Sequence, residues 1–199
     1  MKRYFIGVYN LANCVTYLGI AAAVVGICFA DKPKIAMLML LVSGICDLFD
    51  GRVARMFPRT ETEKRFGIQL DSFADTVSFV IFPAVFLLRQ WRTVWMALTA
   101  IVYVFAGVTR LCWFDITTDG DTKYFQGVPV TYMGLLLPAL YALAALTRYP
   151  APAIPAGILM LVMAVLYVAN IRVKKPGGVW YLIFTLLALA AGVILLLAS

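Results

Sequence analysis

The chain has 199 residues, of which 63% are hydrophobic, and it carries a formal net charge of +7. Soluble domains contain about 45–50% apolar residues, so a water-soluble core has no use for this much apolar surface. The positive charge does not indicate nucleic-acid binding, because clustered Lys and Arg interleaved with stacking aromatic side chains are absent. We therefore expect a protein of the lipid bilayer that binds no nucleic acid.

Apolar stretches of about 18 to 25 residues follow one another along the chain, and each is long enough to cross a hydrocarbon core about 30 Å thick. The expected spans are residues 8–30, 34–57, 67–88, 93–113, 128–147, 153–171 and 179–198. No linker between them is long enough to separate two domains. The sequence thus predicts an all-α integral membrane protein: a bundle of six core transmembrane helices with a seventh at the C-terminus.

The basic residues predict the orientation of the chain, because cytoplasmic loops carry an excess of Lys and Arg. With the N-terminus inside, the inner side receives twelve of them: Lys2, Arg3, Arg52, Arg55, Arg59, Lys64, Arg65, Arg110, Lys123, Arg172, Lys174 and Lys175. The outer side receives five: Lys32, Lys34, Arg89, Arg92 and Arg148. We therefore expect a multi-pass protein of the cell membrane with a cytoplasmic N-terminus.

Four of the ten acidic residues lie inside the second and third expected spans: Asp47, Asp50, Asp71 and Asp75. A carboxylate at the centre of a membrane helix costs about 2.5–3.5 kcal/mol, so the four together need something cationic among them. Residues three or four apart lie on the same helix face, and both pairs have such a spacing. The four carboxylates can therefore share one site between two adjacent antiparallel helices.

Small and basic residues accompany the aspartates. Gly51 and Ala54 lie within the aspartate stripe of the second expected helix, Arg55 lies at its edge, and Gly67 lies on the aspartate face of the third. Small side chains leave room for a ligand. Arg55, with Arg52 as a second candidate, could neutralise a diphosphate.

An oxygen-rich cage suits hard divalent cations such as Mg²⁺ or Mn²⁺. We do not expect zinc, because the chain has no histidine and its four cysteines match no metal-binding spacing. Two ions about 3.5–4 Å apart are a recurring arrangement for displacement at phosphorus. Two other interpretations stay open, namely an Asp–Arg pair that serves helix packing and a divalent-cation transporter. A transporter has no evident need for the glycines and the arginine around the carboxylates.

The two aspartate segments resemble the signature of the CDP-alcohol phosphotransferases, DxxDGxxAR followed by GxxxDxxxD. Residues 47–55 read DLFDGRVAR and residues 67–75 read GIQLDSFAD, so all eight defined positions match. The gap between the two segments is eleven residues, which is longer than usual in the family and falls in the expected cytoplasmic turn. The resemblance covers roughly residues 10–175. We therefore expect a family domain over residues 1–175 and an additional transmembrane helix over residues 176–199.

The resemblance implies a role for each matching residue. Asp47, Asp50 and Asp71 would ligate metal, while Asp75 would both contact the second metal and act as general base. The residues implied to contact the CDP moiety are Gly51, Ala54, Arg55 and Gly67, together with Asn13 and Thr16 of a segment similar to the family's NxxT. The family also implies two bound ions, Mg²⁺ or Mn²⁺, an active site at the cytoplasmic side and a homodimer in the membrane.

Softer features are similar to the phosphatidylserine synthase branch of this family. They are Ser72 directly after the third aspartate, residues 75–79 (DTVSF), residues 110–111 (RL) and residues 125–129 (FQGVP). Val80 departs from the branch, which often has glycine there. The resemblance implies transfer of a phosphatidyl group from CDP-diacylglycerol to the hydroxyl of L-serine, with release of CMP.

The acceptor is the least constrained part of this interpretation. Arg110 is a candidate for binding the carboxylate of serine, although it could equally be a cytoplasmic anchor. Arg59, Lys64 and Arg65 could instead bind a phosphorylated acceptor. The same chemistry with glycerol 3-phosphate or inositol phosphate is therefore the alternative.

Overall fold

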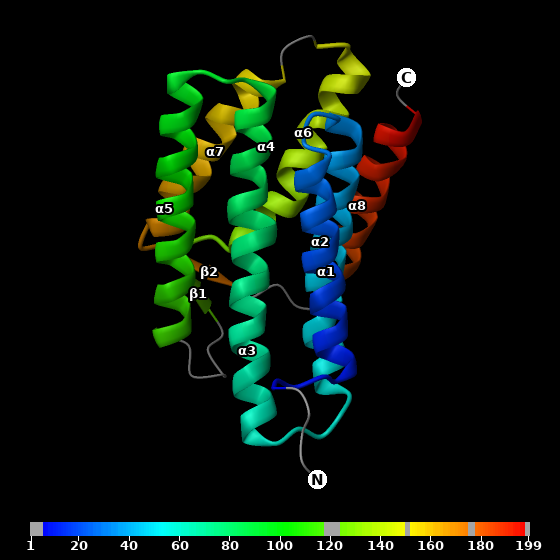
Figure 1. Ribbon diagram of the computed structural model, residues 1–199, viewed down its shortest axis with the longest axis vertical. Coiled ribbons are helices and arrows are strands. Elements are labelled where there is room, and N and C mark those ends of the chain that lie inside the picture. The colour runs from blue at the N-terminus through cyan, green and yellow to red at the C-terminus, as the bar shows by residue number, and fades with distance from the viewer. Residues whose placement is uncertain (1–5, 118–123, 150–151, 175–177, 198–199) are drawn as a thin grey trace.

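The computed structural model describes residues 6–117, 124–149, 152–174 and 178–197 (Figure 1). Its helices are α1 (Leu11–Cys28), α2 (Pro33–Arg55), α3 (Glu61–Asp75), η1 (Thr76–Ile81), α4 (Phe82–Gln90), α5 (Val94–Thr117), η2 (Val130–Tyr132), α6 (Met133–Thr147), α7 (Ala153–Val168) and α8 (Val179–Leu197). Within these described residues, a helix lies over each of the seven expected ranges. The prediction of an all-α membrane protein is confirmed.

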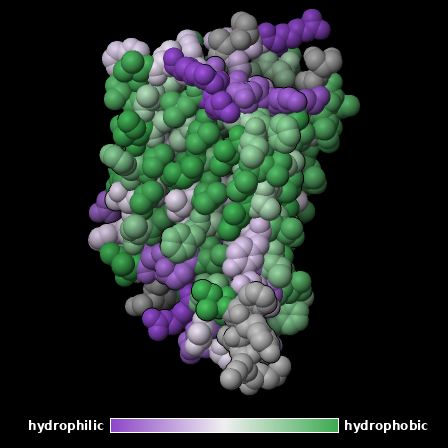
Figure 2. Space-filling model, viewed as in Figure 1, coloured by the Kyte–Doolittle hydropathy of each residue, from purple (hydrophilic) through white to green (hydrophobic). Residues whose placement is uncertain are grey.

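Four helical stretches of the described residues are long and apolar enough to cross a membrane: Leu11–Cys28, Glu61–Gln90, Val94–Thr117 and Val130–Thr147. The helices Ala153–Val168 and Tyr181–Leu197 are apolar but shorter. Figure 2 shows a broad apolar band across one face of the molecule, with hydrophilic residues gathered toward both ends. This distribution is the one that a bilayer requires, while the number of crossings stays a prediction.

Several helix ends differ from the ends of the expected spans. α3 begins at Glu61 rather than at residue 67, after a capping box in which Thr60 and Glu63 each accept a hydrogen bond from the other's backbone amide. The capping box places part of the long gap between the two motif segments in helix rather than in a turn. α5 runs to Thr117 rather than to residue 113, which keeps Asp115 on the helix.

The long helix from Glu61 onward changes its winding directly after Asp75, where η1 is a π-helical segment. Pro83 supplies the reason, because it has no amide hydrogen and leaves the carbonyl of Phe79 without its usual helical donor. The hydroxyl of Tyr103 on α5 donates to that carbonyl instead, at 2.5 Å. Such segments occur frequently at functional sites. Here it adjoins one of the four motif aspartates.

Two glycines let neighbouring helices approach η1 closely. A Cβ atom built on Gly107 of α5 would lie 2.8 Å from Cγ2 of Val80, and one on Gly134 of α6 would lie 2.7 Å from Cε1 of Phe79. Both distances are too short for carbon atoms. Small residues of this kind allow membrane helices to pack closely, so α5 and α6 are held against the aspartate-bearing helix.

One short sheet was not predicted. β1 (Tyr124–Gln126) pairs antiparallel with β2 (Arg172–Lys174), and it joins the connection before α6 to the connection after α7. α8 then packs against α2 and α6, as Figure 1 shows at the right of the bundle.

Candidate active site

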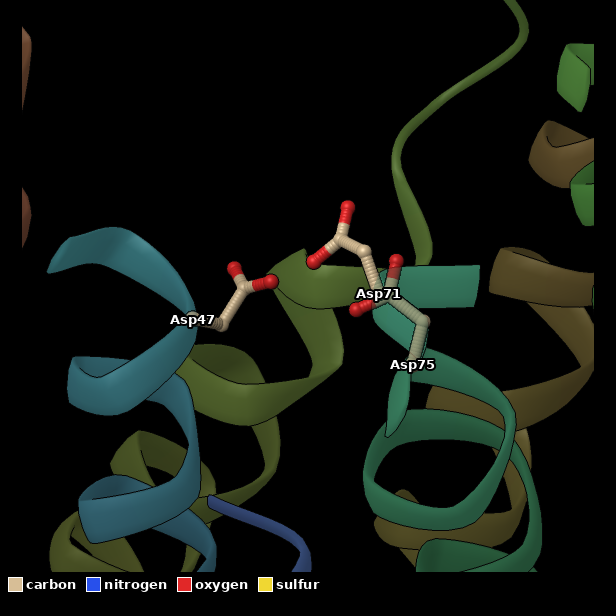
Figure 3. A group of neighbouring side chains, drawn as sticks. All are labelled: Asp47, Asp71 and Asp75. Carbon is tan, nitrogen blue, oxygen red and sulfur yellow. The ribbon is translucent and has the colours of Figure 1, made fainter. Parts of the chain in front are cut away.

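Three of the four motif aspartates converge between α2 and α3. Asp47, Asp71 and Asp75 are partly buried, and each offers a carboxylate oxygen within 4.8 Å of the oxygens offered by the other two. Figure 3 shows Asp47 pointing across from α2 toward the two side chains of α3. Two like charges at this separation repel by roughly 3–4 kcal/mol at an effective dielectric constant near 20, so the arrangement calls for a cation.

One carboxylate oxygen of Asp75 gives a second indication of a bound cation. Its Oδ1 atom is buried and has no hydrogen-bond partner among the described residues. A buried carboxylate oxygen without a partner is costly unless a ligand satisfies it. The residues present therefore fit a hard divalent cation bound by oxygen atoms.

Asp50 lies outside this group of three. Its side chain is buried, and its Oδ2 accepts a 2.7 Å hydrogen bond from the hydroxyl of Thr16 on α1. The sequence predicted both residues for the site but assigned them to different ligands, metal and nucleotide. The structure pairs them with each other.

The aspartates face a cavity of about 680 Å³. It is large enough for a small-molecule ligand. The predicted site residues that line it are Asp47, Asp50, Gly51, Arg55, Asp71, Asp75 and Arg110. Acidic and basic side chains thus line the same cavity, which suits a negatively charged ligand that binds together with metal ions.

Arg110 is 6% exposed, and it reaches the cavity wall from α5. Its Nε donates to the carbonyl of Val128 at 3.2 Å, and its guanidinium lies 4.8 Å from the ring centroid of Phe114. Val128 belongs to the FQGVP segment, so two of the features that are similar to the phosphatidylserine synthase branch are in contact. A buried arginine held in this way has a fixed position for an anion.

One of the other predicted nucleotide-contacting residues, Ala54, lines a second pocket, and two more lie close to Arg59 of that pocket or to each other. Ala54 lines a pocket of about 300 Å³ together with Arg59. A Cβ atom on Gly67 would lie 3.4 Å from Nη1 of Arg59 and 3.6 Å from Oδ1 of Asn13. Asn13 is buried and donates to the carbonyl of Val8 at 2.8 Å. Ala54, Gly67 and Asn13 are not among the residues that line the cavity of the aspartates.

Two contacts at the cavity were missed by the sequence analysis. The hydroxyl of Ser72, which lines the cavity, donates to Asp115 at 2.7 Å. The guanidinium of Arg52 lies 4.5 Å from the ring centroid of Tyr181, and both residues line the cavity. A longer fourth helix would have revealed Asp115, whereas no sequence signal linked Tyr181 of α8 to the site.

Similarity to known proteins agrees with this geometry. The family model of the CDP-alcohol phosphatidyltransferases matches residues 9–199. The CDP-diacylglycerol–serine O-phosphatidyltransferase of Methanocaldococcus jannaschii is 29% identical over 178 residues, which cover 89% of this chain and 80% of that protein. The enzyme of that name from Mycobacterium tuberculosis is 33% identical over 143 residues, 63% of this chain and 48% of that protein. The one from Helicobacter pylori is 33% identical over 136 residues, 65% and 56% respectively.

The chain spans about half the length of the mycobacterial and Helicobacter relatives that it matches. Fold and site together define a membrane protein whose helices enclose a carboxylate cluster within a cavity lined by arginines. The chain belongs to the CDP-alcohol phosphatidyltransferase family. The division into a domain over residues 1–175 and an additional helix over residues 176–199 stays a prediction.

Proposed function

We propose that this protein transfers a phosphatidyl group from CDP-diacylglycerol to the hydroxyl of L-serine, giving phosphatidylserine and CMP. One observation carries the proposal: Asp47, Asp71 and Asp75 offer oxygens within 4.8 Å of one another in a cavity that arginines also line. The three relatives named above are serine O-phosphatidyltransferases by description, which supports serine as the acceptor.

Asp47, Asp71 and Asp75 would hold divalent cations, Mg²⁺ or Mn²⁺, with Asp50 as a further ligand. When bound, such ions would neutralise the charge that builds on the phosphoryl oxygens. The unpartnered Oδ1 of Asp75 supports this assignment. Two ions, as the family resemblance implies, fit four carboxylates.

The chain's own residues would carry out the remaining steps. Asp75 takes the proton of the serine hydroxyl, and the serine oxygen forms a bond to the phosphorus that carries diacylglycerol. The bond from that phosphorus to the bridging oxygen breaks, and CMP leaves with the negative charge. Arg55, which lines the cavity, holds that charge, as Arg52 can. The proton on Asp75 then passes to solvent.

In this proposal, serine and the nucleotide of the donor bind to different residues. Arg110 would bind the carboxylate of serine, because it is a buried guanidinium in the cavity wall. The nucleotide would extend toward Ala54, which lines the second pocket, and toward Gly67 and Asn13, which lie close to each other. This division leaves the aspartates between the two substrates.

The proposed setting is the cell membrane, with the aspartates at its cytoplasmic side and the chain in a homodimer. The excess of basic residues predicted at the aspartate end of the helices supports the orientation. The family resemblance is the support for the dimer. Cross-linking in native membranes would test the oligomeric state, and labelling of single cysteines from either side would test the orientation.

The direct test uses the purified protein in detergent with CDP-diacylglycerol, Mn²⁺ or Mg²⁺, and serine. We expect release of CMP, its loss with EDTA, and its return on adding excess metal. Glycerol 3-phosphate, inositol phosphate and water serve as alternative acceptors. Serine giving no more CMP than water, while a phosphorylated alcohol does, would overturn the acceptor. Metal uptake by reconstituted vesicles without any CMP release would instead support a transporter.

A further inference from the structure

A further pocket lies at the end of the bundle opposite to the aspartates. It measures about 500 Å³ and is formed where α2 and α7 begin and where α6 and α8 end. Figure 1 shows the ends of α6 and α8 at the top, away from α3. Lys34 lines the pocket and precedes Asp47 by thirteen residues, so the two sites lie roughly 20 Å apart along α2. The pocket is separate from the site of the proposed reaction.

Tyr141 gives the first indication of a ligand. It lines the pocket and is 5% exposed, yet its buried hydroxyl has no hydrogen-bond partner among the described residues. Its ring packs edge-on against Phe86, with centroids 5.1 Å apart. A buried tyrosine hydroxyl normally finds a partner, so this one is suited to a ligand atom.

Arg148 gives the second indication. It lines the same pocket and forms no ion pair within the described ranges. It also has the left-handed backbone conformation, φ 52° and ψ 35°, which costs a residue other than glycine some free energy. Glycine is the residue that most often ends a helix in this way. An exposed arginine at such a position points to a use for its charge.

Two helix starts and two helix ends meet at this pocket. The helices α2 and α7 both begin at this pocket, with Pro33 and Pro152 lining it, and neither helix start receives a side-chain cap in the described structure. The partial positive charge of these two N-termini is opposed by the partial negative charge at the ends of α6 and α8, so the side chains of Arg148 and Lys34 give the pocket its positive charge. Lys34 adds a full positive charge, and its Nζ also donates to the carbonyl of Leu196 near the end of α8.

Apolar side chains next to the pocket indicate that the anion belongs to a lipid. Leu195 lines the pocket, while Leu143, Leu146 and Leu196 are exposed on the same two helices, α6 and α8. In a bilayer these leucines face acyl chains. Polar contacts at the helix ends and apolar contacts beside them match the two parts of a phospholipid.

We propose that this pocket binds the phosphate of an anionic phospholipid, at the membrane surface opposite to the aspartates. The lipid would join α8 to the starts of α2 and α7, with Arg148 and Lys34 at its phosphate and Tyr141 donating a hydrogen bond. The proposal does not depend on the transferase reaction, because none of these residues lines the aspartate cavity.

The test measures thermal unfolding of the delipidated protein in a neutral detergent. Phosphatidylglycerol should raise the midpoint by about 4 °C or more, while phosphatidylcholine and inorganic phosphate should leave it unchanged. Native mass spectrometry should detect the bound phosphatidylglycerol. Equal shifts with phosphatidylcholine would overturn the preference for an anionic lipid, and an equal shift with inorganic phosphate would overturn the lipid as its source.

Variants then locate the site. Arg148→Asn removes the charge while asparagine tolerates the left-handed backbone, so the phosphatidylglycerol shift should disappear. Arg148→Lys should retain part of it, and Tyr141→Phe should reduce it. Arg92→Gln, an exposed arginine at the same end, is the matched control and should keep the full shift. A full shift in Arg148→Asn would place the lipid elsewhere and overturn the proposal.

Discussion

The hydroxyl of Ser72 donates a 2.7 Å hydrogen bond to Oδ1 of Asp115, and this contact joins α3 to α5 beside Asp71. Because its hydrogen is engaged by Asp115, the Ser72 oxygen presents its lone pairs to the cavity that it lines. Arg110 reaches the same cavity from α5. In the proposed reaction, the Ser72 oxygen could accept a hydrogen bond from the ammonium group of serine, and Arg110 could bind its carboxylate.

Asp115→Asn removes the negative charge that Ser72 contacts beside the proposed serine site. A hydrogen bond to a charged group contributes roughly 1.5–3 kcal/mol, so we expect the variant to raise the KM for serine by about tenfold or more. The KM for CDP-diacylglycerol should not change. Initial rates of CMP release at varied serine check this, and Ser72→Ala should act in the same direction. Equal increases of both KM values would instead indicate a structural role for the pair.

Asp75→Asn tests the proposed general base. The variant should still bind Mn²⁺ and CDP, because Asp47, Asp50 and Asp71 remain, but CMP release should fall by about 10²–10⁴-fold. Calorimetry measures binding and the CMP assay measures turnover. Asp31→Asn, at the opposite end where Asp31 lies 3.7 Å from Arg89, is the control and should be fully active. Normal turnover in Asp75→Asn would exclude this residue as the base.

Thr16→Val tests the hydrogen bond that holds Asp50. Loss of the hydroxyl leaves a buried carboxylate oxygen without its donor, so affinity for Mn²⁺ should fall by about 10- to 100-fold. Thr16→Ser keeps the hydroxyl and should bind metal almost as well as the original protein. Titration of Mn²⁺ in the presence of CDP distinguishes them. Equal affinities in the two variants would show that Thr16 does not support a metal ligand.

Gly107→Ala should destabilise the bundle, because the added methyl group would lie 2.8 Å from a methyl of the buried Val80. Overpacking of this kind costs about 1–3 kcal/mol. Gly192→Ala is the matched control, since its methyl group would lie 3.7 Å from Cδ1 of Leu41, an ordinary contact distance. Thermal unfolding in detergent compares the two, and a similar midpoint for both would contradict the expectation.

The positions of the helices could be predicted because apolar length and punctuation determine them. Their ends could not, since ends depend on local contacts. The capping box of Thr60 and Glu63 starts α3 early, and α5 continues past its apolar run to include Asp115, which accepts a hydrogen bond from Ser72. The winding change after Asp75 depends on Pro83, whose effect a hydropathy pattern does not show.

The site was predictable as far as helical periodicity and the family motif reach. Spacing places two aspartates on one face of each helix, but it does not say which oxygens meet across the helices. Asp50 is set apart by Thr16, a residue thirty-four positions earlier. Contacts from α8, such as Tyr181 against Arg52, depend on tertiary packing between segments far apart in the chain.

The pairing of β1 with β2 has a consequence for the proposed catalytic cavity. β1 leads within a few residues to Pro129–Tyr132, and β2 precedes Gly178 and Tyr181, all of which line that cavity. The pairing of the two strands therefore links the two segments that line opposite parts of the cavity. An insertion next to either strand would displace the other strand and the cavity-lining segment that follows it. Epitope tags and reporter groups are therefore better placed elsewhere.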